Sequence, residues 1–220
     1  MILNLLIFVF SFLPIGVPNI SGASTASTTN YLAVKKGYVM SYNGAEGRAN
    51  WVGWTLKASD VGPVDRSDRF RQDDNFPRGF KIVDEKDYRE SGYDRGHLCN
   101  SEDRTASEYL NEETFLMSNI IPQTRELNRG PFKFLEAYCR KLAVKKGQSL
   151  LIYSGGIGSK GRLVSGVPIP RFCWKAVYTF IDMFFIALAR GKGILDGWIG
   201  IKAHFYFAKS ISCAYWEALW

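Results

Sequence analysis

Histidine is scarce in this sequence of 220 residues, which contains only His97 and His204. None of the four cysteines belongs to a CxxC pair or a Cys/His cluster, so the chain lacks the ligand spacing of a zinc site. It also lacks zinc-finger, helix-turn-helix and RNP-like motifs, which excludes the common sequence-specific readers of nucleic acid. Any imidazole chemistry therefore falls to one of two residues.

The first 34 residues contain no lysine or arginine. This absence argues against a mitochondrial presequence, which is typically rich in arginine. The apolar stretch of residues 1–16 is about as long as a signal-peptide core and too short to span a bilayer comfortably. Small residues follow it, so we expect a signal peptide over residues 1–23 and a secreted protein, extracellular or periplasmic, without stable membrane association. The alternative is a protein tethered to the membrane by an uncleaved N-terminal segment.

The charge balance is positive, with 28 Lys and Arg against 21 Asp and Glu, a net charge of +7 and a pI of about 9.2. This balance favours a polyanionic partner such as nucleic acid or an anionic membrane surface. The length allows one good core and thus one main domain. In an exported protein, Cys99, Cys139, Cys173 and Cys213 could form two disulfides in three possible pairings. The alternative for Cys99 is a buried, small apolar side chain.

The strongest motif is Asp94-Arg95-Gly96-His97, which is followed by Asn119, Asn128 and Glu136 within forty residues. A lone tetrapeptide is a weak signal, but the ordered series His, Asn, Asn, Glu is much harder to reach by chance. Asn119 lies in the run S-N-I-I-P-Q, nine residues before Asn128. This series resembles the DNA/RNA non-specific endonucleases, the sugar-non-specific nucleases with a ββα-metal active site.

The resemblance covers roughly residues 38–178 and implies an α+β fold, with a central antiparallel sheet flanked by helices and a ββα-metal core. We therefore expect a flexible lead-in over residues 24–37 and a nuclease domain over residues 38–178. No family motif is visible in residues 179–220, which we treat as a divergent C-terminal segment of uncertain structure.

The residue pattern also predicts individual elements. Residues 38–42 and 51–56 predict a hairpin near the turn signal Asn43-Gly44, and residues 80–83 a short strand. A helix is predicted from Pro131, with Gly147 suited to end it. Residues 150–153 predict a buried strand. The apolar face predicted for the helix consists of Phe134, Leu135, Tyr138 and Leu142.

Phosphodiester hydrolysis needs an activated water and neutralisation of phosphate charge. A neutral imidazole can take a proton from water, so His97 is the candidate general base. The resemblance places Asn119 near this histidine, with a backbone carbonyl or a side-chain amide fixing its tautomer. It also makes Asn128 the direct metal ligand. Mg²⁺, with Mn²⁺ as the alternative, suits such an oxygen-ligand site with several waters. Glu136, eight residues after Asn128, would hold a metal-bound water.

Arginine binds phosphate well because its charge is permanent and its planar group can engage two oxygens. Arg66, which lies 31 residues before His97, matches the family arginine that stabilises the transition state, and Arg71 is the second choice. Arg95 and Arg129 are further candidates for binding the substrate. The expected function is a metal-dependent endonuclease that cuts DNA and RNA without strong sequence specificity. The alternative is a catalytically impaired nucleic-acid-binding protein of the same fold. The sequence leaves the oligomeric state open.

Overall fold

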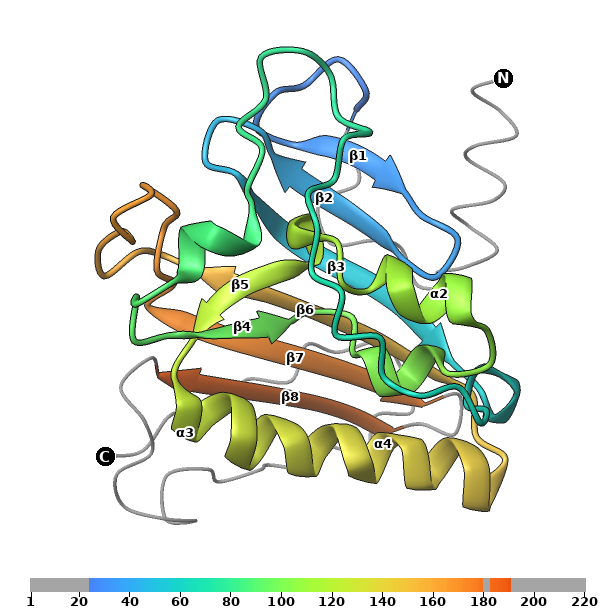
Figure 1. Ribbon diagram of the computed structural model, residues 1–220. Coiled ribbons are helices and arrows are strands. Elements are labelled where there is room, and N and C mark those ends of the chain that lie inside the picture. Colours follow the sequence, from blue (N-terminus) through green and yellow to red (C-terminus); the bar gives the residue numbers. More distant parts are fainter. Residues whose placement is uncertain (1–23, 180–182, 191–220) are drawn as a thin grey trace.

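The computed structural model describes residues 24–179 and 183–190. Within them, a six-stranded antiparallel sheet has the order β1-β2-β3-β6-β7-β8, and a separate pair, β4 and β5, is also antiparallel (Figure 1). The strands of the larger sheet are β1 (Tyr31–Val34), β2 (Val39–Asn43), β3 (Arg48–Leu56), β6 (Leu150–Ile157), β7 (Phe172–Thr179) and β8 (Met183–Arg190). The smaller pair consists of β4 (Asp94–His97) and β5 (Ile120–Gln123). The fold is thus α+β, as predicted.

The helices lie mainly between β4 and β6 along the chain. They are α2 (Glu108–Glu113), α3 (Arg125–Leu127), the π-helical η6 (Asn128–Phe132) and the long α4 (Lys133–Lys146). Short 3₁₀ turns η2, η3, η4 and η5 cover residues 58–60, 85–88, 101–104 and 117–119. In the described residues, no helix is both long and apolar enough to cross a membrane.

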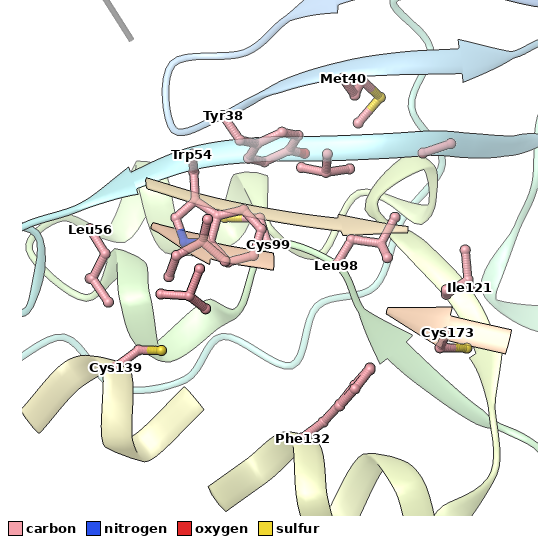
Figure 2. Close-up of a cluster of buried hydrophobic side chains, with 14 of the residues drawn as sticks. Tyr38, Met40, Trp54, Leu56, Leu98, Cys99, Ile121, Phe132, Cys139 and Cys173 are labelled. Carbon is pink, nitrogen blue, oxygen red and sulfur yellow. The ribbon is translucent and has the colours of Figure 1, made fainter. Parts of the chain in front are cut away.

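The main core lies between one face of the larger sheet, the β4–β5 pair and α4 (Figure 2). The sheet contributes alternate residues because side chains point to opposite faces along a strand. The residues of this core come from all three layers and include Met40, Trp54, Leu98, Ile121, Phe132 and Cys139. Packing of the smaller strand pair and of α4 against the same sheet face holds these two elements close together.

The predicted hairpin is confirmed: β2 and β3 pair antiparallel through a turn at residues 44–47. The helix end is also confirmed, because Gly147 adopts a left-handed conformation with φ of 63° directly after α4. Helical structure begins earlier than Pro131, however, since α3 starts at Arg125 and runs through η6 into α4. The strand predicted at residues 150–153 is the first half of β6.

The predicted apolar face of α4 is wrong in part. Phe134 and Tyr138 are 62% and 46% exposed. The face toward the core contains Leu135, Cys139, Leu142 and Ala143 instead. These residues have the helical spacing i, i+4, i+7 and i+8, and two of them are small, which lets the helix approach the sheet closely.

Two further predictions need correction. Residues 24–37 are not simply a lead-in, because β1 lies within them and pairs with β2 in register from Tyr31 opposite Tyr42. The strand predicted at residues 80–83 is absent. Phe80 instead stacks near the Tyr42 ring. The Lys81 amide donates one backbone hydrogen bond to the Gly44 carbonyl, which is too little to pair this segment as a strand.

The C-terminal segment, treated above as divergent, contributes strand β8, whose backbone pairs with β7 along its whole length. Residues 180–182 and 191–220 lie outside the described residues, as does the predicted signal peptide at 1–23.

The two-disulfide arrangement is wrong, because it would require a bond among Cys99, Cys139 and Cys173, and all three are free. They lie after β4, on α4 and on β7, in the interior of the core. Burial raises the pKa of each thiol to about 12. They therefore behave as small apolar side chains. Cys213 lies outside the described residues.

Candidate active site

The DRGH motif forms strand β4, and His97 is its last residue, opposite Ile120 of β5. The imidazole is buried against two aromatic rings, with centroid distances of 5.5 Å to Phe70 and 4.8 Å to Phe115. Its Nε2 atom is buried and has no hydrogen-bond partner. A buried polar atom without a partner is costly and calls for an explanation, of which a catalytic role is one.

Burial lowers the pKa of His97 well below its usual value of 6.5. The positive charges of Arg66, Lys175 and Arg95 lower it further. The imidazole is therefore neutral at pH 7, with a nitrogen lone pair available to accept a proton. This is the state that a general base requires.

Asn119 is fully buried, and its amide binds the backbone rather than the imidazole. Its Oδ1 accepts a hydrogen bond from the Cys99 amide at 2.9 Å, and its Nδ2 donates to the carbonyls of Cys99 and Thr114 at 2.8 Å each. The Asn119 carbonyl also accepts from the Leu98 amide at 2.9 Å. The structure thus gives Asn119 a supporting position: it fixes the chain directly after His97.

Asn128 lies at the start of η6 and contacts the first residue of the DRGH motif. Its Nδ2 donates to Oδ2 of Asp94 at 2.9 Å, while Arg129 donates to both Asp94 oxygens at 2.8 and 2.9 Å. Although burial opposes ionisation, the hydrogen bonds from Arg129 and Asn128 lower the pKa of Asp94 below its ordinary value. Because Asp94 engages the amide nitrogen, Oδ1 of Asn128 remains available as a ligand.

Glu136 lies on α4 and is held from two sides. Its Oε2 accepts a hydrogen bond from Asn100 at 2.6 Å, and its Oε1 pairs with Lys175 at 3.1 Å. Burial raises the pKa of Glu136, and the nearby Lys175 ammonium opposes that effect. Asn100 follows His97 by three residues, so Glu136 connects α4 to the segment that leaves β4.

The donor set fits a cation with few protein ligands. Among the described residues, no group of three or more His, Cys, Asp or Glu side chains is placed to hold a metal ion. A hard cation that keeps most of its waters needs only one or two protein oxygens. Oδ1 of Asn128 can supply one, and the Glu136 carboxylate is an acceptor for hydrogen bonds from bound water.

A cleft of about 410 Å³ opens beside the motif. Asp94, Asn128 and three of the four predicted arginines line it, namely Arg66, Arg95 and Arg129. His97 is not among its lining residues, but Phe70 is, and Phe70 contacts the His97 ring. The cleft is therefore lined by arginines, three of which pair with the lining carboxylates Asp68, Glu85 and Asp94, and it adjoins the buried imidazole.

The arginines of the cleft are held by the protein in different ways. Arg66 donates through Nε to Asp68 and through another guanidinium nitrogen to Oγ of Ser101 at 2.9 Å, and 43% of its side chain is exposed. Arg95 forms an ion pair with Glu85, and its guanidinium lies 4.1 Å from the centroid of the Phe70 ring. Each can turn unused donor groups toward an anion in the cleft.

Arg71 does not join this site. It donates to the carbonyl of Glu112 at 2.9 Å and lines a second cleft together with Lys35 and Tyr109. Phe70 lines the first cleft, so the two adjacent side chains point to different places. Arg66 and Arg71 therefore line different clefts, and of the two only Arg66 lines the cleft beside the DRGH motif.

Sequence reasoning missed Lys175 and Asn100, which both contact Glu136. Asn100 lies just after DRGH, and nothing in the local sequence distinguishes it from a turn residue. Lys175 had a usable signal: it lies between Cys173 and Val177, which face the main core. A charged residue at a core position of an apolar strand predicts a buried partner.

These elements define a class of protein. A strand pair that ends in a buried histidine, followed by a helical segment that carries Asn128 and Glu136, is the arrangement of a ββα-metal nuclease. The DNA/RNA non-specific endonuclease family matches residues 17–180 of this chain. The chain therefore belongs to that family, whose members are typically metal-dependent.

Individual relatives agree with this assignment. A nuclease of Nostoc sp. is 46% identical over 162 residues, which cover 72% of this chain and 59% of that protein. Nuclease C1 of Cunninghamella echinulata is 31% identical over 65% of this chain and 63% of that protein. The chain thus spans about three fifths of the length of these relatives. A crystal structure of an EndoG/EndoGI complex shares the fold, with a TM-score of 0.68 at 22% identity, over 84% of this chain and 80% of that chain.

Proposed function

We propose that this protein is an endonuclease that hydrolyses phosphodiester bonds of DNA and RNA without strong sequence specificity and uses Mg²⁺. The observation that carries the proposal is the neutral, buried His97 with an unpartnered Nε2 beside an arginine-lined cleft. Family membership supports the same activity. Two residues of the helical segment contact the chain on either side of His97. Asn128 binds Asp94, three residues before it, and Glu136 binds Asn100, three residues after it.

Substrate binding falls to the arginines of the cleft. Arg66, Arg95 and Arg129 offer permanent charge and several donors to phosphate oxygens. Contacts to phosphate carry no direct sequence information, so binding is expected to be salt-sensitive and largely independent of sequence.

In the hydrolytic step, Nε2 of His97 takes a proton from water as the water oxygen bonds to phosphorus. The P–O3′ bond breaks, and the departing 3′ oxygen takes a proton from solvent water, which leaves a 5′-phosphate and a 3′-hydroxyl. The His97 imidazolium then returns its proton to solvent. Arg66 meets the negative charge that grows on the phosphate. A bound cation, held through Oδ1 of Asn128 and the Glu136 carboxylate, would supply charge neutralisation and help the leaving oxygen.

A plasmid-nicking assay with purified protein tests the proposal. We expect supercoiled plasmid and RNA to be cut with Mg²⁺ and left intact with excess chelator. The His97→Ala substitution should lower the cleavage rate by a factor of roughly 10²–10⁴, the contribution typical of a general base. A folded wild-type protein that binds DNA but never cuts it would overturn the proposal and favour a nucleic-acid-binding protein of the same fold.

We also infer export from the cell, on the basis of the apolar N-terminal stretch and the small residues after it. Sequencing the mature N-terminus tests this directly. Cleavage near residue 23 and recovery in the medium or periplasm are expected. An intact N-terminus in the membrane fraction would instead favour a tethered nuclease.

A further inference from the structure

Lys175 is a buried lysine in the main core. It lies on β7, and its side chain is 1% exposed. Its ammonium lies between two aromatic rings, at 5.3 Å from the centroid of Trp54 and 5.3 Å from that of Phe132. An ammonium without partners would be very costly in such a place. Its contacts should therefore reveal why a charge is present.

Two of these contacts reach the site. Nζ donates to the carbonyl of Leu98 at 2.7 Å and pairs with Oε1 of Glu136 at 3.1 Å. Leu98 is the residue directly after His97, and Glu136 lies on α4. One ammonium thus connects the strand that ends in the general base to the helix that carries the glutamate.

The remaining groups complete a small network. Oε2 of Glu136 accepts from Asn100, so both ends of residues 98–100 are tied to Glu136, one directly and the other through Lys175. The anchor itself is rigid, because β7 is paired along its length with β6 and β8. Lys175 therefore ties two other parts of the chain to the central sheet. One is the segment after β4, and the other is helix α4.

We propose that Lys175 is a positioning residue of the nuclease site, which sets the placement of the Glu136 carboxylate and of the backbone after His97 relative to each other. The inference rests on the proposed nuclease function. Lys175 is buried in the core and acts only through Glu136 and the Leu98 carbonyl. Its neighbours on the same face of β7, Cys173 and Val177, are apolar, so the charge of Lys175 serves Glu136 and the Leu98 carbonyl.

The test compares Lys175→Met with a matched control, Lys35→Met. Lys35 is also a largely buried lysine, paired with Asp73 at 2.7 Å, but it lines the second cleft. Partners that support a metal site typically account for about 10- to 100-fold in affinity or activity. We expect Lys175→Met to lower kcat and to weaken Mg²⁺ binding, measured by calorimetry without substrate, by factors in that range. KM should stay within about twofold, and Lys35→Met should leave all three quantities near wild type.

Folding must be separated from positioning, because removal of one partner of a buried ion pair is strongly destabilising. All assays are therefore run where circular dichroism shows folded protein. If Lys175→Met does not fold, the double variant Lys175→Met/Glu136→Gln removes both charges and is compared with Glu136→Gln alone. We expect its kcat to be at least fivefold lower, because the Leu98 carbonyl has lost its donor.

Unchanged kcat and Mg²⁺ affinity in folded Lys175→Met, or equal rates in the double variant and Glu136→Gln, would overturn the inference. Neither result would affect the proposed function, which fails only if the wild-type protein does not cut nucleic acid.

Discussion

The side-chain amide of Asn128 donates its hydrogen bond to Asp94, with 2.9 Å between Nδ2 and Oδ2. This bond joins the first residue of the DRGH strand to the first residue of η6, which lies 34 residues later in the chain. An amide has one donor end and one acceptor end, so fixing the nitrogen also fixes the oxygen. The aspartate of the motif thereby gains a physical role: it orients the Asn128 amide and leaves Oδ1 available to the proposed cation.

We predict that Asn128→Ala raises the Mg²⁺ concentration for half-maximal rate by at least tenfold, because the variant loses the proposed direct ligand. Glu136→Gln, which keeps an oxygen that can accept from bound water, should raise it less. Titration of Mg²⁺ against initial rate on one plasmid substrate measures both. An unchanged midpoint in folded Asn128→Ala would contradict the assignment of Asn128.

The second prediction concerns pH. Since burial and nearby cations lower the pKa of His97, its neutral form persists below pH 6.5. The base should therefore remain active there and be lost only as the pH falls through the lowered pKa. We expect the acidic limb of kcat/KM to have its midpoint below 6.5, at constant ionic strength. The His97 imidazole resonances, assigned with His97→Gln, should titrate over the same range, and a midpoint at or above 7 would count against this role.

Local signals in the sequence predicted much of this fold. The turn at Asn43-Gly44 and the strands around it depend on neighbouring residues, and so does the helix end at Gly147. The DRGH strand and the order of His97, Asn119 and Asn128 were also recognisable, because the site is built from one continuous region of chain.

What the sequence did not predict depends on contacts between distant segments. The buried face of α4 was misassigned because large aromatic residues dominated the periodic pattern, although small residues at Cys139 and Ala143 make the contact. The family resemblance predicts Asn119 beside the imidazole, whereas the structure shows its amide bound to backbone groups of Cys99 and Thr114. The core position of Lys175 indicates a buried partner, but that partner, Glu136, lies 39 residues earlier and is not marked by any local pattern.

The third prediction separates two arginines that the sequence could not rank decisively. Arg66 lines the cleft beside the motif, whereas Arg71 donates to a carbonyl and lines the other cleft. We expect Arg66→Ala to lower kcat by at least tenfold with a smaller effect on KM, because its charge is proposed to act on the transition state. Arg71→Ala, the matched control, should change kcat by less than threefold. The reverse order in steady-state kinetics would show that the register of this segment is misassigned.

The last prediction concerns Gly96, the third residue of the motif. A Cβ atom at this position would lie well inside 3.0 Å of the Gln123 side chain. Gln123 is fully buried on β5, so it has little room to move away. Overpacking of this kind typically costs about 1–3 kcal/mol. Gly96→Ala should therefore reduce the free energy of unfolding by an amount in that range and shift the strand that ends at His97, with a loss of activity.

The partner of this clash provides the control. Neither polar atom of the Gln123 side chain has a hydrogen-bond partner in the structure. Its truncation therefore removes the obstacle without breaking any bond seen there. We expect the double variant Gly96→Ala/Gln123→Ala to be more stable in urea unfolding than the sum of the two single changes predicts, and to regain part of the activity. Strict additivity would mean that glycine is required at position 96 for a reason other than the close approach of Gln123.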